Sequence, residues 1–145
     1  MTIPSPQAKV FRYEKPKLTR PKKVEVLART DIMHAAVQIV REGGENNLHT
    51  HEHLDGVWFV LAGRARFYTD DDVVVADLGP KEGVLIPRHF RYWFESSGDE
   101  ELEILQFEAS DRSFSSHKEL LDDRIDYTPR NPNTLPDPVE VAAHG

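Results

Sequence analysis

The stretch NNLHTHEHLDGVWFVLAG, from Asn46 to Gly63, decides how this chain is interpreted. It places three of the seven histidines of the chain close together, at His49, His51 and His53, and an apolar run follows directly. Residues two apart on an extended strand share a face, so the three imidazoles are expected to point the same way. Because imidazole is a frequent ligand of divalent transition metals, the pattern predicts a metal site in a β-rich protein.

Length, charge and composition limit the classes of function. The 145 residues suit one domain, and the absence of Cys excludes thiol catalysis and a disulfide framework. A net charge of -7 argues against nucleic acid and anionic membranes as partners. There is no apolar run of the roughly 18 residues that a membrane span needs, and no signal peptide is recognised at the N-terminus. A cytoplasmic protein with a small-molecule ligand is expected.

The centre of the chain predicts short strands rich in β-branched and aromatic residues, separated by turns such as TDDD and SSGDE. The expected strands cover residues 35–40, 56–63, 64–70, 72–78, 83–87, 91–96 and 102–109. Many short strands at nearly even spacing, without intervening helices, predict an all-β sandwich or barrel.

Three regions follow from this pattern. Residues 1–23, rich in Pro and Lys, are expected to form an extended arm, and residues 24–110 the barrel. In residues 111–145, the segment SSHKELLDDRI (115–125) has a capping-box pattern that predicts a short helix. A Pro-rich irregular tail is expected after it.

The spacing of glycines and histidines resembles the cupin superfamily. Gly43, the pair His49 and His51, and the turn at Gly63 are similar to the first cupin motif, and residues 79–94 are similar to the second. The resemblance covers roughly residues 30–110 and implies a double-stranded β-helix, or jelly-roll, barrel of the RmlC-like kind.

The resemblance also implies where a metal would bind, and this chain departs from it. Many cupins hold Fe, Mn, Ni or Zn with two His and one Glu from the first motif and one His from the second. Here His49 and His51 match, but the Glu position is Gly56 and the second-motif His position is Tyr92. A divalent metal, with Fe(II) favoured and Mn, Ni or Zn as alternatives, is still expected at His49 and His51.

The third ligand is open. His53 is one candidate, since it shares the alternation of the other two histidines, and an exposed loop position is the alternative. The usual turn glycine of the second motif is His89, and Tyr92 and His89 are candidates for acid–base work.

Strand alternation predicts the remaining pocket. Trp58, Phe94 and Gln106 are expected to face the histidines, and Arg66 is a candidate clamp for a substrate carboxylate. The opposite face is also apolar, and it is expected to be covered by the N-terminal arm or by a second copy in a homodimer. This second set is Val57, Phe59, Leu61, Trp93, Leu105 and Phe107.

Three functions are compatible with these residues. The first is a metal-dependent enzyme, most simply a non-heme dioxygenase acting on a small, partly apolar organic substrate, with a Lewis-acid isomerase or lyase as a near variant. The second is a metal-free module that binds a small ligand as a sensor or carrier. The third is a metal-free epimerase-like enzyme with His51 as base and Tyr92 as acid.

Overall fold

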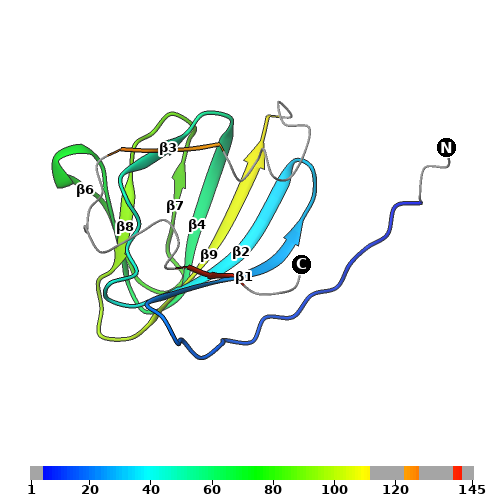
Figure 1. Ribbon diagram of the computed structural model, residues 1–145, viewed down its shortest axis with the longest axis horizontal. Helices are drawn as coiled ribbons and strands as arrows, with labels where there is room; N and C mark the ends of the chain where they lie inside the picture. Colours follow the sequence, from blue (N-terminus) through cyan, green and yellow to red (C-terminus); the bar gives the residue numbers. More distant parts are fainter. Residues whose placement is uncertain (1–4, 112–122, 128–138, 142–145) are drawn as a thin grey trace.

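The computed structural model describes residues 5–111, 123–127 and 139–141 of the chain, which form strands and almost no helix. Figure 1 shows the strands wrapped into a barrel, with an extended N-terminal segment that leaves it. The strands are β1 (Lys22–Arg29), β2 (Met33–Val40), β3 (His49–His51), β4 (Leu54–Ala62), β5 (Ala65–Tyr68), β6 (Val74–Leu78), β7 (Gly83–Ile86), β8 (Trp93–Ser96), β9 (Leu102–Ser110), β10 (Arg124–Asp126) and β11 (Val139–Val141).

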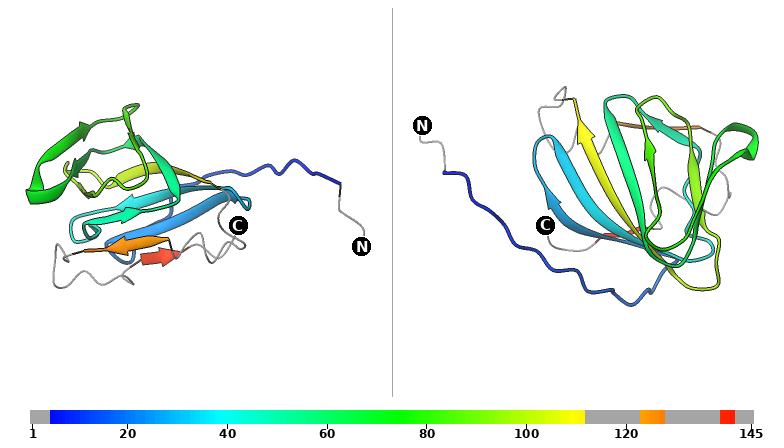
Figure 2. Two further views of the ribbon diagram at one scale, coloured as in Figure 1. Left: turned by 90° about the horizontal axis from the view of Figure 1, so that it is seen from above. Right: turned by 180° about the vertical axis from the view of Figure 1, so that it is seen from behind.

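Two sheets form the walls of the barrel. The larger has six strands in the order β11-β1-β2-β9-β4-β7, and the smaller has three in the order β6-β5-β8. A further pair, β10 and β3, is antiparallel, and His49 also forms a bridge with Tyr92. Figure 2 shows the two sheets as separate layers when the barrel is viewed from above. The chain thus has the predicted all-β jelly-roll architecture.

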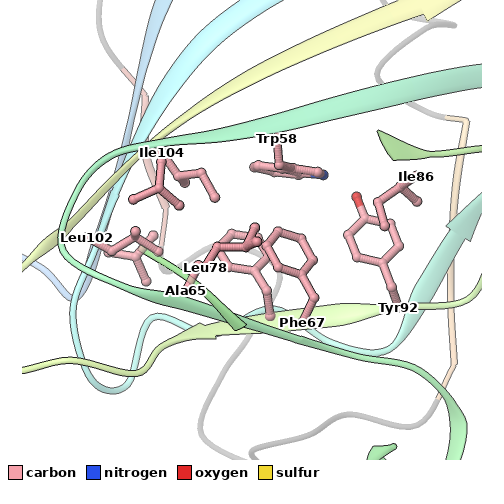
Figure 3. Packing of buried hydrophobic residues seen from close by; sticks show 11 residues of the cluster. Trp58, Ala65, Phe67, Leu78, Ile86, Tyr92, Leu102 and Ile104 are labelled. Carbon is pink, nitrogen blue, oxygen red and sulfur yellow. The ribbon is translucent and has the colours of Figure 1, made fainter. Parts of the chain in front are cut away.

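Aromatic side chains fill the space between the sheets. Phe67 and Phe94 are fully buried and stack with ring centroids 5.0 Å apart, while Trp58 lies 4.8 Å from Phe94. Figure 3 shows Trp58, Phe67 and Tyr92 converging from different strands. Burying one such ring contributes roughly 1.5–3 kcal/mol, so this cluster is a main source of stability for the barrel.

The outer face of the large sheet is only partly covered. Leu18 of the N-terminal arm is buried against Val37 and Ile39 of β2, and Tyr13 packs beside it. Apolar side chains further along the same sheet remain exposed: Val57, Leu61, Leu85 and Phe107. The arm therefore covers one part of the face, as one of the two sequence alternatives predicted. Trp93, expected on this face, is instead buried on the small sheet, where its ring stacks on Tyr68.

The C-terminal region differs from the prediction. The segment 115–125 was expected to be helical, but its last two residues begin strand β10, which pairs with β3. Ile125 stands opposite Thr50, so pairing with the histidine strand prevails over local helix propensity. Residues 112–122 of the expected helix lie outside the described residues. No helix among the described residues is long and apolar enough to cross a membrane.

Candidate functional site

A cavity of about 260 Å³ lies inside the barrel and includes the two motif histidines. Strands β1, β2, β4 and β9 form one wall, and β3, Tyr92 and Arg124 form the other. Its surface is mostly apolar, as expected from the sequence, but more polar and charged side chains line it than the few that the sequence indicated. The polar lining residues are Lys22, Arg29, His34, Gln38, Asn46, His49, His51, Tyr92, Gln106, Glu108 and Arg124.

His49 is buried at the base of this cavity. Its backbone N–H donates to Tyr92 O at 3.0 Å, and Tyr92 N–H donates back at 2.9 Å. Nδ1 of His49 lies 2.7 Å from the carbonyl oxygen of Asn47, which fixes Nδ1 as the protonated nitrogen and leaves Nε2 for the cavity. Burial, with a smaller contribution from the charge of Arg124, holds the pKa of His49 well below its usual value. This imidazole is therefore neutral at pH 7.

His51 lies between two carboxylates. Its Nδ1 is 3.5 Å from Asp123 Oδ2, and its Nε2 is 3.9 Å from Glu108 Oε2. Burial lowers the pKa of His51, although both carboxylates act in the opposite direction. Asp123, the nearer carboxylate, favours the tautomer with a proton on Nδ1, which leaves the lone pair of Nε2 on the side of Glu108.

Tyr92 supplies a buried hydroxyl to the same cavity. Its ring centroid lies 4.3 Å from that of His49. Burial raises the pKa of Tyr92 above its usual value, and a side-chain hydrogen bond with Trp58 acts weakly in the other direction. Figure 3 shows the Trp58 nitrogen on the side of the phenol oxygen. Because the indole N–H can only donate, the phenol accepts this bond and keeps its own proton to give to a ligand.

Glu108 lines the cavity and was not predicted from the sequence. It stands opposite Gly56 in the β4–β9 register, and its Oε1 lies 3.4 Å from His34 Nδ1. The alternation that brings Leu102, Ile104 and Gln106 inward continues to position 108, so extending it by two residues predicts this carboxylate.

Other cavity residues come from more distant parts of the chain. Asp123 and Arg124 reach the site because β10 pairs with β3, and Lys22 reaches it at the start of β1. No local pattern in the sequence indicates these long-range pairings. The amide of Gln106, a predicted pocket residue, accepts a hydrogen bond of 3.0 Å from Gln38 Nε2.

Several predicted site residues do not lie in the cavity. The chain bends after β3, so His53 turns outward, and its Nδ1 lies 3.4 Å from Asp111. His89 is exposed in a turn, with φ of 73°. Arg66 pairs with Asp77 on the outside of the small sheet. Phe94 belongs to the hydrophobic core, whereas Trp58, Gln106 and Tyr92 line the cavity as predicted.

Two histidines of the cavity could contribute to a metal site. His49 and His51 approach each other with ring centroids 5.3 Å apart, but His53, the expected third ligand, faces away. Within residues 5–111, 123–127 and 139–141, no group of three His, Asp or Glu is arranged to hold a metal ion. The side chains in this arrangement therefore do not form a three-ligand metal site.

Comparison with known proteins agrees with the fold. Residues 36–107 match the family described as Cupin domain. The two sheets, the paired histidines of β3 and this match together show that the chain belongs to the cupin superfamily. No curated protein sequence matches the chain as a relative.

Similar solved structures share the fold at low sequence identity. A cupin superfamily protein from Desulfitobacterium hafniense DCB-2 is 19% identical, with a TM-score of 0.56 over 68% of this chain and 84% of that one. KdgF from Halomonas sp. is 17% identical, with a TM-score of 0.59 over 71% and 94%. The DMSP lyase DddQ from Ruegeria pomeroyi DSS-3 is 20% identical, with a TM-score of 0.53 over 70% of this chain and 46% of that one.

Proposed function

We propose that this cupin is an epimerase- or isomerase-like enzyme that moves a proton on a small organic substrate. The observation that carries the proposal is the pairing of a base and an acid in one cavity. Asp123 at Nδ1 favours the tautomer of His51 whose Nε2 can accept a proton, and Tyr92 keeps its hydroxyl proton. Both side chains line the cavity of about 260 Å³.

The directions of the two pKa shifts suit these roles. Burial lowers the pKa of His51, so its imidazole is neutral and can accept a proton at pH 7. Burial raises the pKa of Tyr92, so its phenol stays protonated and can donate. In the proposed step, Nε2 of His51 removes a proton from a carbon next to a carbonyl group. The C–H electron pair moves toward the carbonyl oxygen, which takes the proton of Tyr92, and an enediol forms. His51 then gives its proton to the former carbonyl carbon while the neighbouring hydroxyl returns a proton to Tyr92, which moves the carbonyl group by one carbon and restores both side chains.

Deuterium exchange tests this assignment. The protein is incubated in D₂O with a panel of small hydroxy-carbonyl compounds, and loss of the exchangeable C–H signal is followed by NMR. Exchange catalysed by the wild type is expected to fall by roughly 10²–10⁴-fold in His51→Gln and in Tyr92→Phe. The matched control is His53→Gln, because that histidine lies outside the cavity and its loss leaves exchange unchanged. Equal exchange in the wild type and both site variants contradicts the roles assigned here.

A metal-dependent oxidation, including the dioxygenase activity expected from the sequence, is the second candidate function. One observation favours it: Nδ1 of His49 and of His51 each face an oxygen, which leaves both Nε2 atoms for a shared ligand. Such outer hydrogen bonds are common around metal-bound imidazoles. The absence of a three-ligand group among the described residues argues against it.

Metal analysis separates the two candidates. The tag-free protein and a His49→Ala/His51→Ala variant are compared by plasma mass spectrometry, with His53→Ala as control. About one equivalent of Fe, Mn, Ni or Zn that is lost only in the double variant supports the second candidate and directs a search for O₂ consumption. Traces of metal that are equal in all three proteins, and that added Fe(II) does not raise, support the acid–base enzyme.

A further inference from the structure

Lys22 is a cation buried inside the barrel wall. Lys22 is only 6% exposed to solvent, and it lines the cavity. Its ammonium nitrogen lies 5.5 Å from the ring centroid of Phe94, and the charge of Glu45 acts on its pKa less than burial and the charge of Arg124 do. Burying a charge without an opposite charge is costly, so this position is suited to a ligand that supplies one.

Arg124 brings a second positive charge to the same cavity. Its Nε donates to Asp126 Oδ1 at 2.8 Å, which leaves the terminal nitrogens of the guanidinium for other acceptors. The charge of Arg124 acts on Lys22 and lowers its pKa further, after the larger effect of burial. Two cations that repel each other across one cavity are both stabilised by an anion placed between them.

Gln38 adds an acceptor near this pair. Its amide nitrogen donates to Gln106, while its Oε1 is buried and has no hydrogen-bond partner in the described part of the chain. Lys22 and Gln38 belong to paired strands, where Lys22 stands opposite Val40 and Gln38 stands two residues before it. The two side chains are therefore diagonal neighbours and can contact one small ligand. A hydroxyl group is the ligand feature that would satisfy Oε1.

We propose that the cavity binds a small hydroxycarboxylate, with its carboxylate between Lys22 and Arg124 and a hydroxyl donating to Gln38. This inference rests on the proposed function and adds the substrate class to it. The volume of about 260 Å³ lies just below the roughly 300–1,000 Å³ of sites for drug-sized ligands, so an acid of a few carbon atoms fits. The anchored carboxylate holds the neighbouring carbon in the cavity that His51 and Tyr92 line.

Binding of matched probes tests the substrate class. Glycerate, its amide glyceramide and the deoxy acid propionate are titrated into the full-length protein at pH 6 by calorimetry. Glycerate is expected to bind at least about tenfold more tightly than either probe. Lys22→Gln and Arg124→Gln each weaken glycerate by at least about tenfold, and Gln38→Leu removes the preference for glycerate over propionate. The control Lys81→Gln changes an exposed turn lysine and leaves binding unchanged.

The outcomes separate this inference from the catalytic assignment. Thermal unfolding shows whether Lys22→Gln folds. If it does not fold, the glycerate affinity of Arg124→Gln tests the proposal independently. If glycerate still binds to His51→Gln, the substrate class is supported, even if the wild type catalyses no deuterium exchange. Equal affinity for glycerate and glyceramide, no binding of either up to 100 mM, or binding unaffected in both cation variants overturns the proposal.

Discussion

Glu108 stands directly opposite Gly56 on the neighbouring strand. Side chains at directly opposed positions of an antiparallel pair lie on the same face, so Glu108 carries a carboxylate on the face where Gly56 has no side chain. In the cupin pattern, position 56 is the one that carries Glu. This chain therefore supplies the carboxylate beside His51 from β9 instead of β4, at 3.9 Å from Nε2.

Replacing the carboxylate of Glu108 by a neutral amide is expected to change the pKa of His51. The charge of Glu108 raises the pKa of His51 against the larger, opposite effect of burial. Glu108→Gln is therefore expected to lower the pKa of His51 further, as followed by NMR of labelled histidine. Glu100→Gln, at an exposed position, serves as the control. A His51 pKa that stays constant or rises in Glu108→Gln contradicts the arrangement.

Asp123 connects the C-terminal strand to the histidine loop. Its Oδ2 accepts backbone hydrogen bonds from Glu52 at 3.1 Å and His53 at 3.3 Å, besides its contact with His51. Asp123→Ala leaves these donors without their partner and is expected to cost roughly 1–3 kcal/mol in the free energy of unfolding. Urea unfolding measures this loss. Asp126→Ala removes only an exposed ion pair with Arg124 and is expected to cost less than about 1 kcal/mol, so equal losses contradict the role of Asp123.

The local sequence pattern was sufficient to predict the barrel fold and the side chains of β4 that point inward. The alternation from Gly56 correctly placed Trp58 and Val60 inside and Val57 outside, because period-two patterning determines which side chains a sheet buries. The same rule extended along β9 reaches Glu108. It failed for His53, since β3 ends at His51 and the chain bends before the third histidine.

Tertiary pairing determined the rest of the site. Lys22 and Arg124 reach the cavity, and Asp123 reaches His51, through strands whose partners are distant in sequence. Lys22 lies in a Pro- and Lys-rich segment, and its sequence context does not distinguish it from the solvent-exposed lysines of that segment. The charged groups of the cavity were therefore not predictable from the strand pattern, which indicated an aromatic pocket with few polar groups.

The turn after β4 depends on a glycine. Gly63 has φ of +79°, and a Cβ there would lie 2.8 Å from the backbone oxygen of Glu101. Gly63→Ala is therefore expected to destabilise the protein by more than about 1 kcal/mol, because both the conformation and the space exclude a side chain. Gly56→Ala is the matched control, since its Cβ would meet the Phe107 oxygen at an ordinary 3.6 Å. Thermal unfolding compares the two, and an equal fall in Tm contradicts the prediction.

Lys22 makes stability depend on pH in a defined window. Burial lowers the pKa of Lys22 to about 7, whereas an unfolded chain has a lysine pKa of about 10.4. Between these values the unfolded chain binds a proton that the folded chain has released, so stability rises with pH from about 7 to about 10. The raised pKa values of Tyr13 and Tyr92 act in the opposite direction only above about pH 10.

Lys22→Met is expected to remove this rise and to increase stability at pH 7 and below, since it replaces an unpaired buried cation with an apolar side chain of similar length. Urea unfolding at pH 6, 8 and 9.5 measures the effect, with Lys81→Met as an exposed control that keeps the wild-type slope. If Lys22→Met retains the wild-type dependence on pH, then the ammonium is either solvated or already neutralised in the folded protein. The same result removes the basis for an anion site at Lys22, because a cation that costs nothing to bury needs no carboxylate from a ligand.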